Sequence, residues 1–141
     1  MKTLITLLTL FILSSCNFNS TYQNRENDKI DAEKITHKFY YSQTYGNKND
    51  ALNLFSEKFF AVTNRDKLNE MISSSENDFG KITEYNLKNW ETLIVKGSNP
   101  KSEYLLTYDV RREKEPTQET FSMIKEDGII KIIGYRITKL Y

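Results

Sequence analysis

Cysteine and histidine are almost absent from this chain, which contains one residue of each. A single cysteine excludes an internal disulfide, and it leaves the usual zinc sites short of ligands. The lone histidine, His37, would have to serve any triad by itself, and the sequence has no Gly-x-Ser-x-Gly elbow and no phosphate loop. We therefore expect no metal site, no cofactor and no catalytic residue.

An excess of charge of one sign is also missing. The sequence has 20 basic and 19 acidic residues. If Lys2 were removed together with an N-terminal signal sequence, the remaining chain would have no formal net charge. Nucleic-acid-binding proteins usually carry a basic excess, because phosphate contacts dominate their affinity. The balance thus predicts no nucleic-acid partner, and no polybasic segment is present to hold an anionic lipid surface.

Long apolar runs are limited to the N-terminus, where the run is shorter than the about 20 residues of a transmembrane helix. It follows Lys2 and ends in Leu13-Ser14-Ser15-Cys16. A positive start, an apolar run and small residues before a cut site are typical of a secretory signal. Leu13-Ser14-Ser15-Cys16 also resembles the lipobox of bacterial lipoproteins. The resemblance implies that the signal, residues 1–15, is removed and that Cys16 becomes an acylated N-terminus.

The lipobox predicts membrane lipid as the partner of Cys16 and the bacterial cell envelope as the location. Asn17 follows the cysteine in place of the aspartate that favours inner-membrane retention in the enterobacterial pattern, so we expect the outer membrane, facing the periplasm. Residues 16–27 are mostly polar and rich in asparagine, which predicts a flexible tether. Residues 28–141 suit a single domain with one core.

Apolar residues spaced by three and four predict helices in the first half of this domain. The first helix should begin near Asp28 and end at Gly46, and the second should begin near Asn49. A third should follow the capping sequence Thr63-Asn64-Arg65-Asp66. The polar residues 73–78 should then form a loop.

After Gly80 the hydrophobic period changes to two, which predicts about four antiparallel strands. We expect these strands at residues 90–95, with a start as early as Lys81, and at 103–111, 117–125 and 129–140. Turns are expected at residues 97–100 and at Asp127-Gly128, with a charged loop at residues 111–116. The last strand is apolar on both faces, which is typical of an interior strand covered on both sides, and Gly134 suggests a bulge.

Helices followed by an antiparallel sheet indicate an α+β fold, with helices on one face of a curved sheet. Several segments resemble the nuclear transport factor two-like, or cystatin-like, cone fold, as found in small exported bacterial proteins of unknown function. They are Phe79-Gly80-Lys81, residues 104–110, Glu119-Thr120-Phe121 and residues 128–135. The final strand departs from that pattern, since Ile130 stands where tryptophan is frequent. The resemblance implies a cone-like fold and transfers no catalytic residue.

The cone fold implies a cavity between the sheet and its longest helix, and aromatic side chains with polar tips suit such a pocket. The candidate lining residues are Tyr41, Trp90, Tyr104, Tyr108 and Tyr135. The same residues also suit a filled core. Asp109 and Glu119 could meet across neighbouring strands as paired carboxylates, although such charges usually lie on a solvated face.

These observations predict a membrane-anchored lipoprotein with a non-catalytic binding or interaction domain, whose ligand is a protein or a small molecule. One alternative is a small enzyme that uses the cone cavity, which requires an ionisable pair inside it. Another is an accessory envelope or immunity protein that acts through a sheet face, which an exposed contiguous apolar patch would favour.

Overall fold

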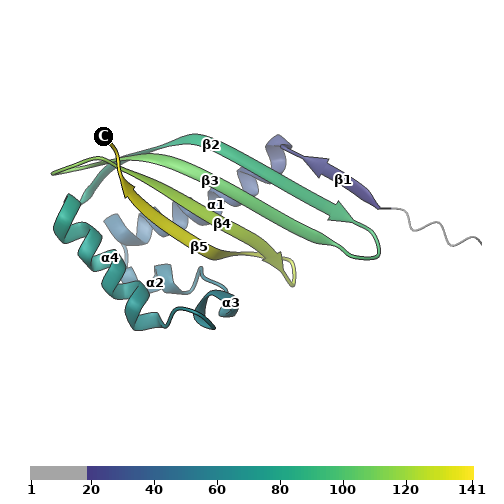
Figure 1. The fold of residues 1–141 in the computed structure, drawn as a ribbon, viewed down its shortest axis with the longest axis horizontal. Helices are drawn as coiled ribbons and strands as arrows, with labels where there is room; N and C mark the ends of the chain where they lie inside the picture. The colour runs from purple at the N-terminus through teal and green to yellow at the C-terminus, as the bar shows by residue number, and fades with distance from the viewer. Residues whose placement is uncertain (1–18) are drawn as a thin grey trace, which may run out of the picture.

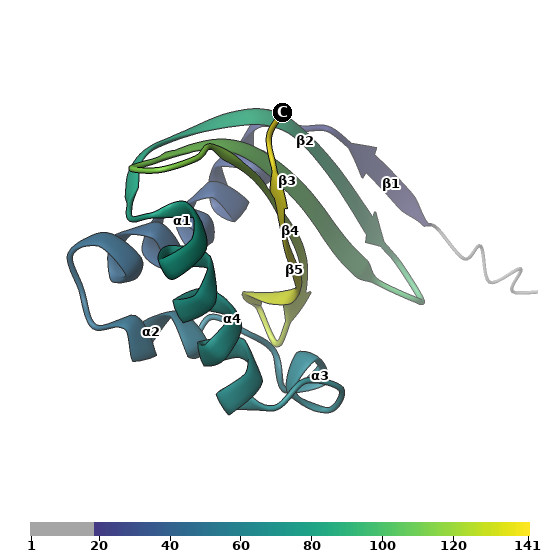
Figure 2. The ribbon, with the colours of Figure 1, turned by 60° about the vertical axis from the view of Figure 1, so that its left-hand side comes forward.

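The computed structural model describes residues 19–141, in which a curved antiparallel sheet wraps around a long helix (Figures 1 and 2). The signal sequence and Cys16 lie outside the described residues. The elements follow one another as β1 (Ser20–Gln23), α1 (Glu26–Thr44), α2 (Lys48–Leu52), α3 (Glu57–Phe60), α4 (Arg65–Phe79), β2 (Ile82–Lys96), β3 (Lys101–Arg112), β4 (Thr117–Glu126) and β5 (Ile129–Lys139).

The predicted α+β class is confirmed, but the sheet has five strands, in the order β1-β2-β3-β4-β5, where about four were expected. The additional strand β1 pairs antiparallel with residues 93–96 of β2. Asn24 continues this connection, because its backbone N–H donates to the Thr92 carbonyl and its side-chain oxygen accepts from the Thr92 N–H. The expectation of a flexible tether was therefore wrong for residues 20–23, which are held by the sheet.

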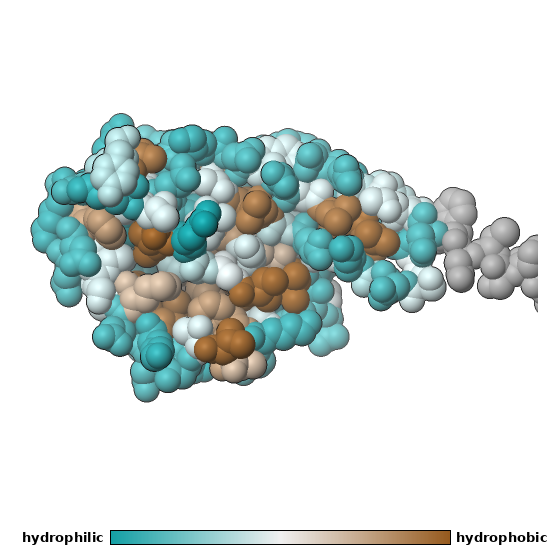
Figure 3. Space-filling model, in the orientation of Figure 1, coloured by the Kyte–Doolittle hydropathy of each residue, from teal (hydrophilic) through white to brown (hydrophobic). Residues whose placement is uncertain are grey.

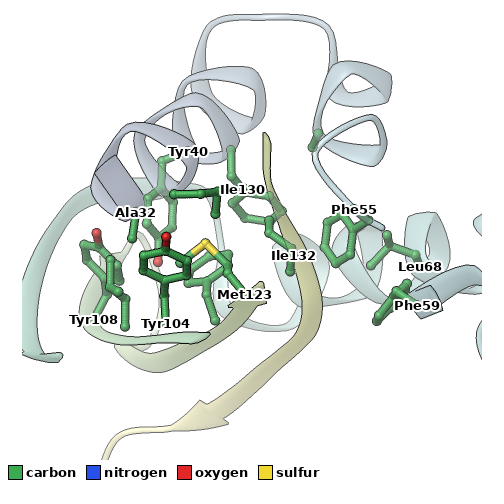
Figure 4. Packing of buried hydrophobic residues seen from close by; sticks show 14 of the residues in the cluster. Ala32, Tyr40, Phe55, Phe59, Leu68, Tyr104, Tyr108, Met123, Ile130 and Ile132 are labelled. Atoms are coloured by element: carbon green, nitrogen blue, oxygen red, sulfur yellow. The ribbon is translucent and has the colours of Figure 1, made fainter. Parts of the chain in front are cut away.

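Helix α1 covers one face of the sheet, called the concave face here, and the opposite face carries no helix and is called the open face (Figure 1). Ala32, Thr36, Phe39 and Tyr40 are completely buried and recur at helical spacing. Figure 4 shows Ala32 and Tyr40 beside Tyr104, Tyr108 and Met123, with Phe55, Phe59 and Leu68 extending the core. Large aromatic side chains thus fill the middle of the space between helix and sheet.

The predicted second helix is two short helices, α2 and α3, separated by a segment that pairs with β5. The Ser56 N–H donates to the Ile132 carbonyl at 2.8 Å, and the Ile132 N–H donates to the Leu54 carbonyl at 2.9 Å. Strand β5 is the last strand in the sheet order and is therefore an edge strand, so the prediction of an interior strand was wrong. Ile130 and Ile132 of this strand are buried on the side of the helices, whereas Ile129 and Ile133 are exposed. The Leu54–Ser56 segment pairs with part of the strand's outer edge.

Helix α4 continues through residues 73–78, so the predicted loop was wrong. The Asn64 side chain accepts from the Lys67 N–H and caps the helix, and Leu68, Ile72 and Ser75 form its buried stripe. The helix ends at Gly80, which has a φ of 84°. A Cβ on Gly80 would lie 2.9 Å from both Glu113 Cβ and the Lys114 nitrogen, so this corner requires glycine.

Successive side chains of a strand point to opposite faces of the sheet, so every second side chain lies on the concave face. On β3 these are Tyr104, Leu106, Tyr108, Val110 and Arg112, and on β4 they are Thr117, Glu119, Phe121 and Met123. The predicted bulge near Gly134 is confirmed by a register shift, since Ser122 pairs with Gly134 and Met123 pairs with Ile132. Both alternating sets therefore carry polar residues into the core at the same end of the sheet.

Candidate functional site

A buried ion pair between Arg112 and Glu119 lies on the concave face at the end of β3 and the start of β4. Arg112 Nη2 donates to Glu119 Oε1 at 2.6 Å, and the two side chains are 3% and 0% exposed. Arg112 Nε also donates to the Thr117 hydroxyl, and Arg112 Nη1 donates to the Gly80 carbonyl, both at 3.1 Å. The pair therefore fixes the helix corner at Gly80 to two strands.

Three hydroxyl groups complete the surroundings of Glu119. The Tyr135 hydroxyl donates to Oε2 at 2.6 Å and the Tyr40 hydroxyl donates to the same oxygen at 3.2 Å, while Thr117 donates to Oε1 at 3.1 Å. Burial, and then the nearby Glu119 carboxylate, raise the pKa of the Tyr40 and Tyr135 hydroxyls well above 10.0. Glu119 thus has four donors on its two oxygens, and both phenols remain protonated donors at neutral pH.

A cavity of about 390 Å³ opens beside this network, between the C-terminal end of α1, helix α4 and the start of β2. We call it the α1–α4 cavity. Its walls include the buried Phe39 and Ile72, with Arg112 and Tyr135 on the sheet side. This size falls within the usual range of small-molecule pockets.

Several polar side chains line the α1–α4 cavity. Gln43 lines it, and the Gln43 amide nitrogen is buried with no hydrogen-bond partner among the described residues. Lys48 of α2 and Glu76 of α4 form an ion pair on the lining, and Lys81 is a further lining residue. The cavity therefore combines apolar walls with a few convergent polar groups.

The five aromatic residues proposed from the sequence do not share one cavity. Tyr135 lines the α1–α4 cavity, but Tyr108 is 1% exposed and shares a 2.6 Å hydrogen bond with the Thr36 hydroxyl inside the core. Tyr104 is also buried, while Tyr41 is 64% exposed on the outer face of α1. Trp90 is half-buried, with the Lys29 Nζ atom 5.5 Å from its ring centroid.

The possible carboxylate pair, Asp109 and Glu119, is separated by strand register. Glu119 is opposite Tyr108 and Asp109 is opposite Gln118, so the two carboxylates point to opposite faces of the sheet. Asp109 contacts Lys88 and Gln118 on the open face. His37 is exposed and lies 3.0 Å from the Tyr85 hydroxyl through Nδ1, outside the α1–α4 cavity.

Sequence reasoning missed Gln43 and Arg112 and named Glu119 only as a possible partner of Asp109, although the strand pattern carried a signal for both Arg112 and Glu119. Phe121 and Met123 are two residues apart in the strand predicted at residues 117–125, and the same period of two reaches Glu119. In the same way, the alternation from Tyr104 to Val110 continues to Arg112. Gln43 had no such signal, because only the three-dimensional arrangement of α1 and α4 creates the cavity.

The open face carries apolar side chains toward the β2–β3 hairpin, as Figure 3 shows among polar neighbours. Leu93, Leu105, Ile124 and Ile133 line one groove there, and Ile133 is 36% exposed. Toward the other end of this face, the Thr107 and Thr120 hydroxyls share a 3.2 Å hydrogen bond. The open face is therefore apolar at one end and polar at the other.

Within residues 19–141, no helix has the length and hydropathy needed to cross a membrane, and no group of three or more His, Cys, Asp or Glu side chains could hold a metal ion. Comparison of the chain with family models, with curated proteins and with solved structures finds no match.

Proposed function

We propose that this chain is a lipid-anchored protein of the bacterial cell envelope whose domain binds a ligand without chemical turnover. The Leu13-Ser14-Ser15-Cys16 lipobox supports the anchor. The same resemblance, together with Asn17, supports a place on the outer membrane that faces the periplasm. The domain then works beside a membrane surface.

The observation that carries this proposal is the position of the cavity relative to the point where the chain enters the sheet. Strand β1 begins at Ser20, four residues after Cys16, and four residues reach at most about 14 Å. Asn19 contacts the β2–β3 turn, because its side-chain oxygen accepts from the Ser98 N–H at 3.2 Å. An acyl group on Cys16 would thus hold the β2–β3 hairpin close to the membrane.

The α1–α4 cavity lies at the other end of β2. It is lined by Ile82, whereas the chain enters beside Lys96, and the 15 residues of β2 span about 45 Å along the strand (Figure 1). An anchored domain would accordingly present its cavity away from the lipid, where periplasmic ligands have access. This arrangement suits a tethered binding protein.

Binding without turnover is favoured by the state of the ionisable groups at the cavity. A general acid or base must reach the reacting group. Glu119 already accepts from four donors and is not part of the lining, and Lys48 and Glu76 neutralise each other at the mouth. Reproducible turnover of a substrate by the purified protein would support the enzyme alternative instead.

The anchor is tested by expressing the full chain with Cys16→Ala in a bacterial host. We expect the wild-type chain to partition into membranes and to gain the mass of its acyl groups, because two or more chains hold a protein firmly. Cys16→Ala should be neither acylated nor processed by the lipoprotein signal peptidase. Ser15→Ala is the matched control, since it keeps a small residue before the cysteine and should be processed normally. An unacylated wild-type chain would contradict the proposal.

A second candidate function is supported by the apolar end of the open face, where a protein partner of the envelope could dock. A photo-crosslinking residue placed at Ile133 should give one discrete adduct in cells if this face is the working surface. Leu105→Glu should abolish the adduct, while Thr107→Glu, on the polar part of the same strand and face, should leave it unchanged. Equal effects of the two substitutions would remove this candidate.

A further inference from the structure

Two residues that line the α1–α4 cavity, Arg112 and Gln43, have hydrogen-bond donors without an acceptor among the described residues. An arginine side chain has five N–H groups. Three of those on Arg112 donate to Thr117, Gly80 and Glu119, and two have no acceptor among the described residues. Arg112 is also one of the residues that line the cavity. The buried amide nitrogen of Gln43 adds further donors without a protein partner. Buried donors of this kind destabilise the fold unless an acceptor pairs with them, so this part of the lining suits an oxygen-bearing group.

The walls of the cavity suit an apolar body attached to that group. Phe39 is completely buried and Ile72 is 5% exposed, and both line the cavity. The half-buried Ile82 and Tyr135 continue this surface on the sheet side. A ligand with an apolar body would displace water from these side chains, which is favourable in proportion to the apolar area covered.

The charges around the cavity favour one negative charge on the ligand. Glu76 offsets Lys48, and Glu119 offsets Arg112, while Lys81 adds a further positive charge on the lining. The side chains that line the cavity are therefore positive overall, and the carboxylates of Glu119 and Glu113, which are not part of the lining, contact Arg112 and the Lys81 N–H from beside it. Charge-assisted hydrogen bonds from arginine to a carboxylate are about twice as strong as neutral ones.

We propose that the α1–α4 cavity binds a small monocarboxylate, with its carboxylate at Arg112 and Gln43 and its apolar body against Phe39 and Ile72. This inference rests on the proposed binding function and names the ligand class. Gln43 of α1 and Arg112 of β3 would then each donate a hydrogen bond to the ligand carboxylate. Neutral amides of the same shape would lack the charge and add unwanted donors, so they should bind more weakly.

The test is a titration of the mature lipoprotein, held in phospholipid nanodiscs, with phenylacetate and cyclohexanecarboxylate as probes and empty nanodiscs as the blank. Isothermal calorimetry should show saturable binding of both acids, with phenylacetamide at least about tenfold weaker. The side-chain amide signal of Gln43 in nitrogen-15 NMR spectra should shift with the same saturation curve. No saturable binding of either acid, or equal binding of phenylacetamide, would overturn the inference.

Two substitutions separate the cavity from the rest of the surface. Gln43→Leu should weaken phenylacetate binding by about tenfold, and Ile72→Phe should abolish it by filling the cavity. Gln118→Leu is the matched control, because it removes the same amide from the open face and should leave binding unchanged. If Gln118→Leu weakens binding as much as Gln43→Leu does, the carboxylate does not bind in this cavity. A chain that is acylated at Cys16 but binds no acid would overturn the ligand class and leave the anchor standing.

Discussion

Asp109 and Glu119 are carboxylates on neighbouring strands, one register step apart, and they occupy opposite faces of the sheet. Glu119 is 0% exposed and accepts four hydrogen bonds from Arg112, Thr117 and two tyrosines. Asp109 is 37% exposed and contacts Lys88 and Gln118. The same chemical group is therefore buried and fully hydrogen-bonded on the concave face and partly solvated on the open face. The difference follows from strand register, which decides the face on which each carboxylate lies.

The largest expected effect comes from removing the charge on each carboxylate in turn. Glu119→Gln leaves the Arg112 guanidinium buried without its counterion, which should lower the free energy of unfolding by about 3–5 kcal/mol. Asp109→Asn should change it by less than about 0.5 kcal/mol. Urea unfolding followed by circular dichroism measures both, and equal losses would show that the two environments are energetically alike.

A double substitution sharpens the same comparison. Replacing the pair as Arg112→Met with Glu119→Leu removes both charges together, and buried ion pairs exchanged for apolar residues are often neutral in stability. We expect this variant to recover most of the loss seen in Glu119→Gln. If it is less stable than the single variant, the network contributes stability beyond charge compensation.

A smaller effect is expected from the phenols that donate to Glu119, and it depends on pH. Burial raises the pKa of the Tyr40 and Tyr135 hydroxyls well above 10.0, the value of the unfolded chain. The folded state consequently holds more protons above pH 10, and stability is full below pH 10 and falls as the pH rises beyond it. Tyr135→Phe should lower stability at neutral pH by about 1–2 kcal/mol and flatten this alkaline loss.

Tyr41→Phe is the control for the pH series, because Tyr41 is 64% exposed and its ring lies on the outer face of α1. Thermal unfolding between pH 7 and pH 11.5 should give the same curve for this variant as for the wild-type chain. A Tyr135→Phe curve that parallels the wild type above pH 10 would mean that this phenol does not carry the alkaline transition.

The smallest expected effect belongs to the ion pair on the open face. Lys88 and Asp109 are 49% and 37% exposed, with Nζ and Oδ2 3.1 Å apart. Exposed pairs of this kind contribute about 0–1 kcal/mol and are screened by salt. A double-mutant cycle with Lys88→Ala and Asp109→Ala should give a coupling energy below about 1 kcal/mol that vanishes in 1 M salt. A larger, salt-independent value would mean that this face is covered.

Period-two alternation predicted the strands and most of the core, since residues such as Tyr108 and Phe121 lie where the pattern expects them. The same alternation reaches Glu119 and Arg112, but charged side chains rarely enter a core, so the sequence favours a solvated face for Glu119 and a loop for Arg112. Their burial depends on partners far away in the sequence, such as Tyr40. Local patterns do not reveal such partners.

Two elements show how tertiary contacts override local preference. Residues 73–78 include three serines, one asparagine and one aspartate, which favour turns, yet the Asn64 cap and the buried Leu68, Ile72 and Ser75 hold them in α4. Strand β1 is short and polar, and only its pairing with β2 makes it a strand. The α1–α4 cavity is likewise a product of how α1, α4 and the sheet meet, so neither its position nor Gln43 could be read from the sequence.

The most direct test of the account measures how far the two ends of the sheet lie from the membrane. Acylation of Cys16 uses the only thiol, so a cysteine introduced at Asn99 or at Lys81 can be labelled alone. Energy transfer from the label to a dye on lipid headgroups should be strong for Asn99→Cys in the β2–β3 turn and weak for Lys81→Cys beside the cavity, because β2 spans about 45 Å. Equal transfer from the two positions, or stronger transfer from Lys81→Cys, would contradict the proposed orientation.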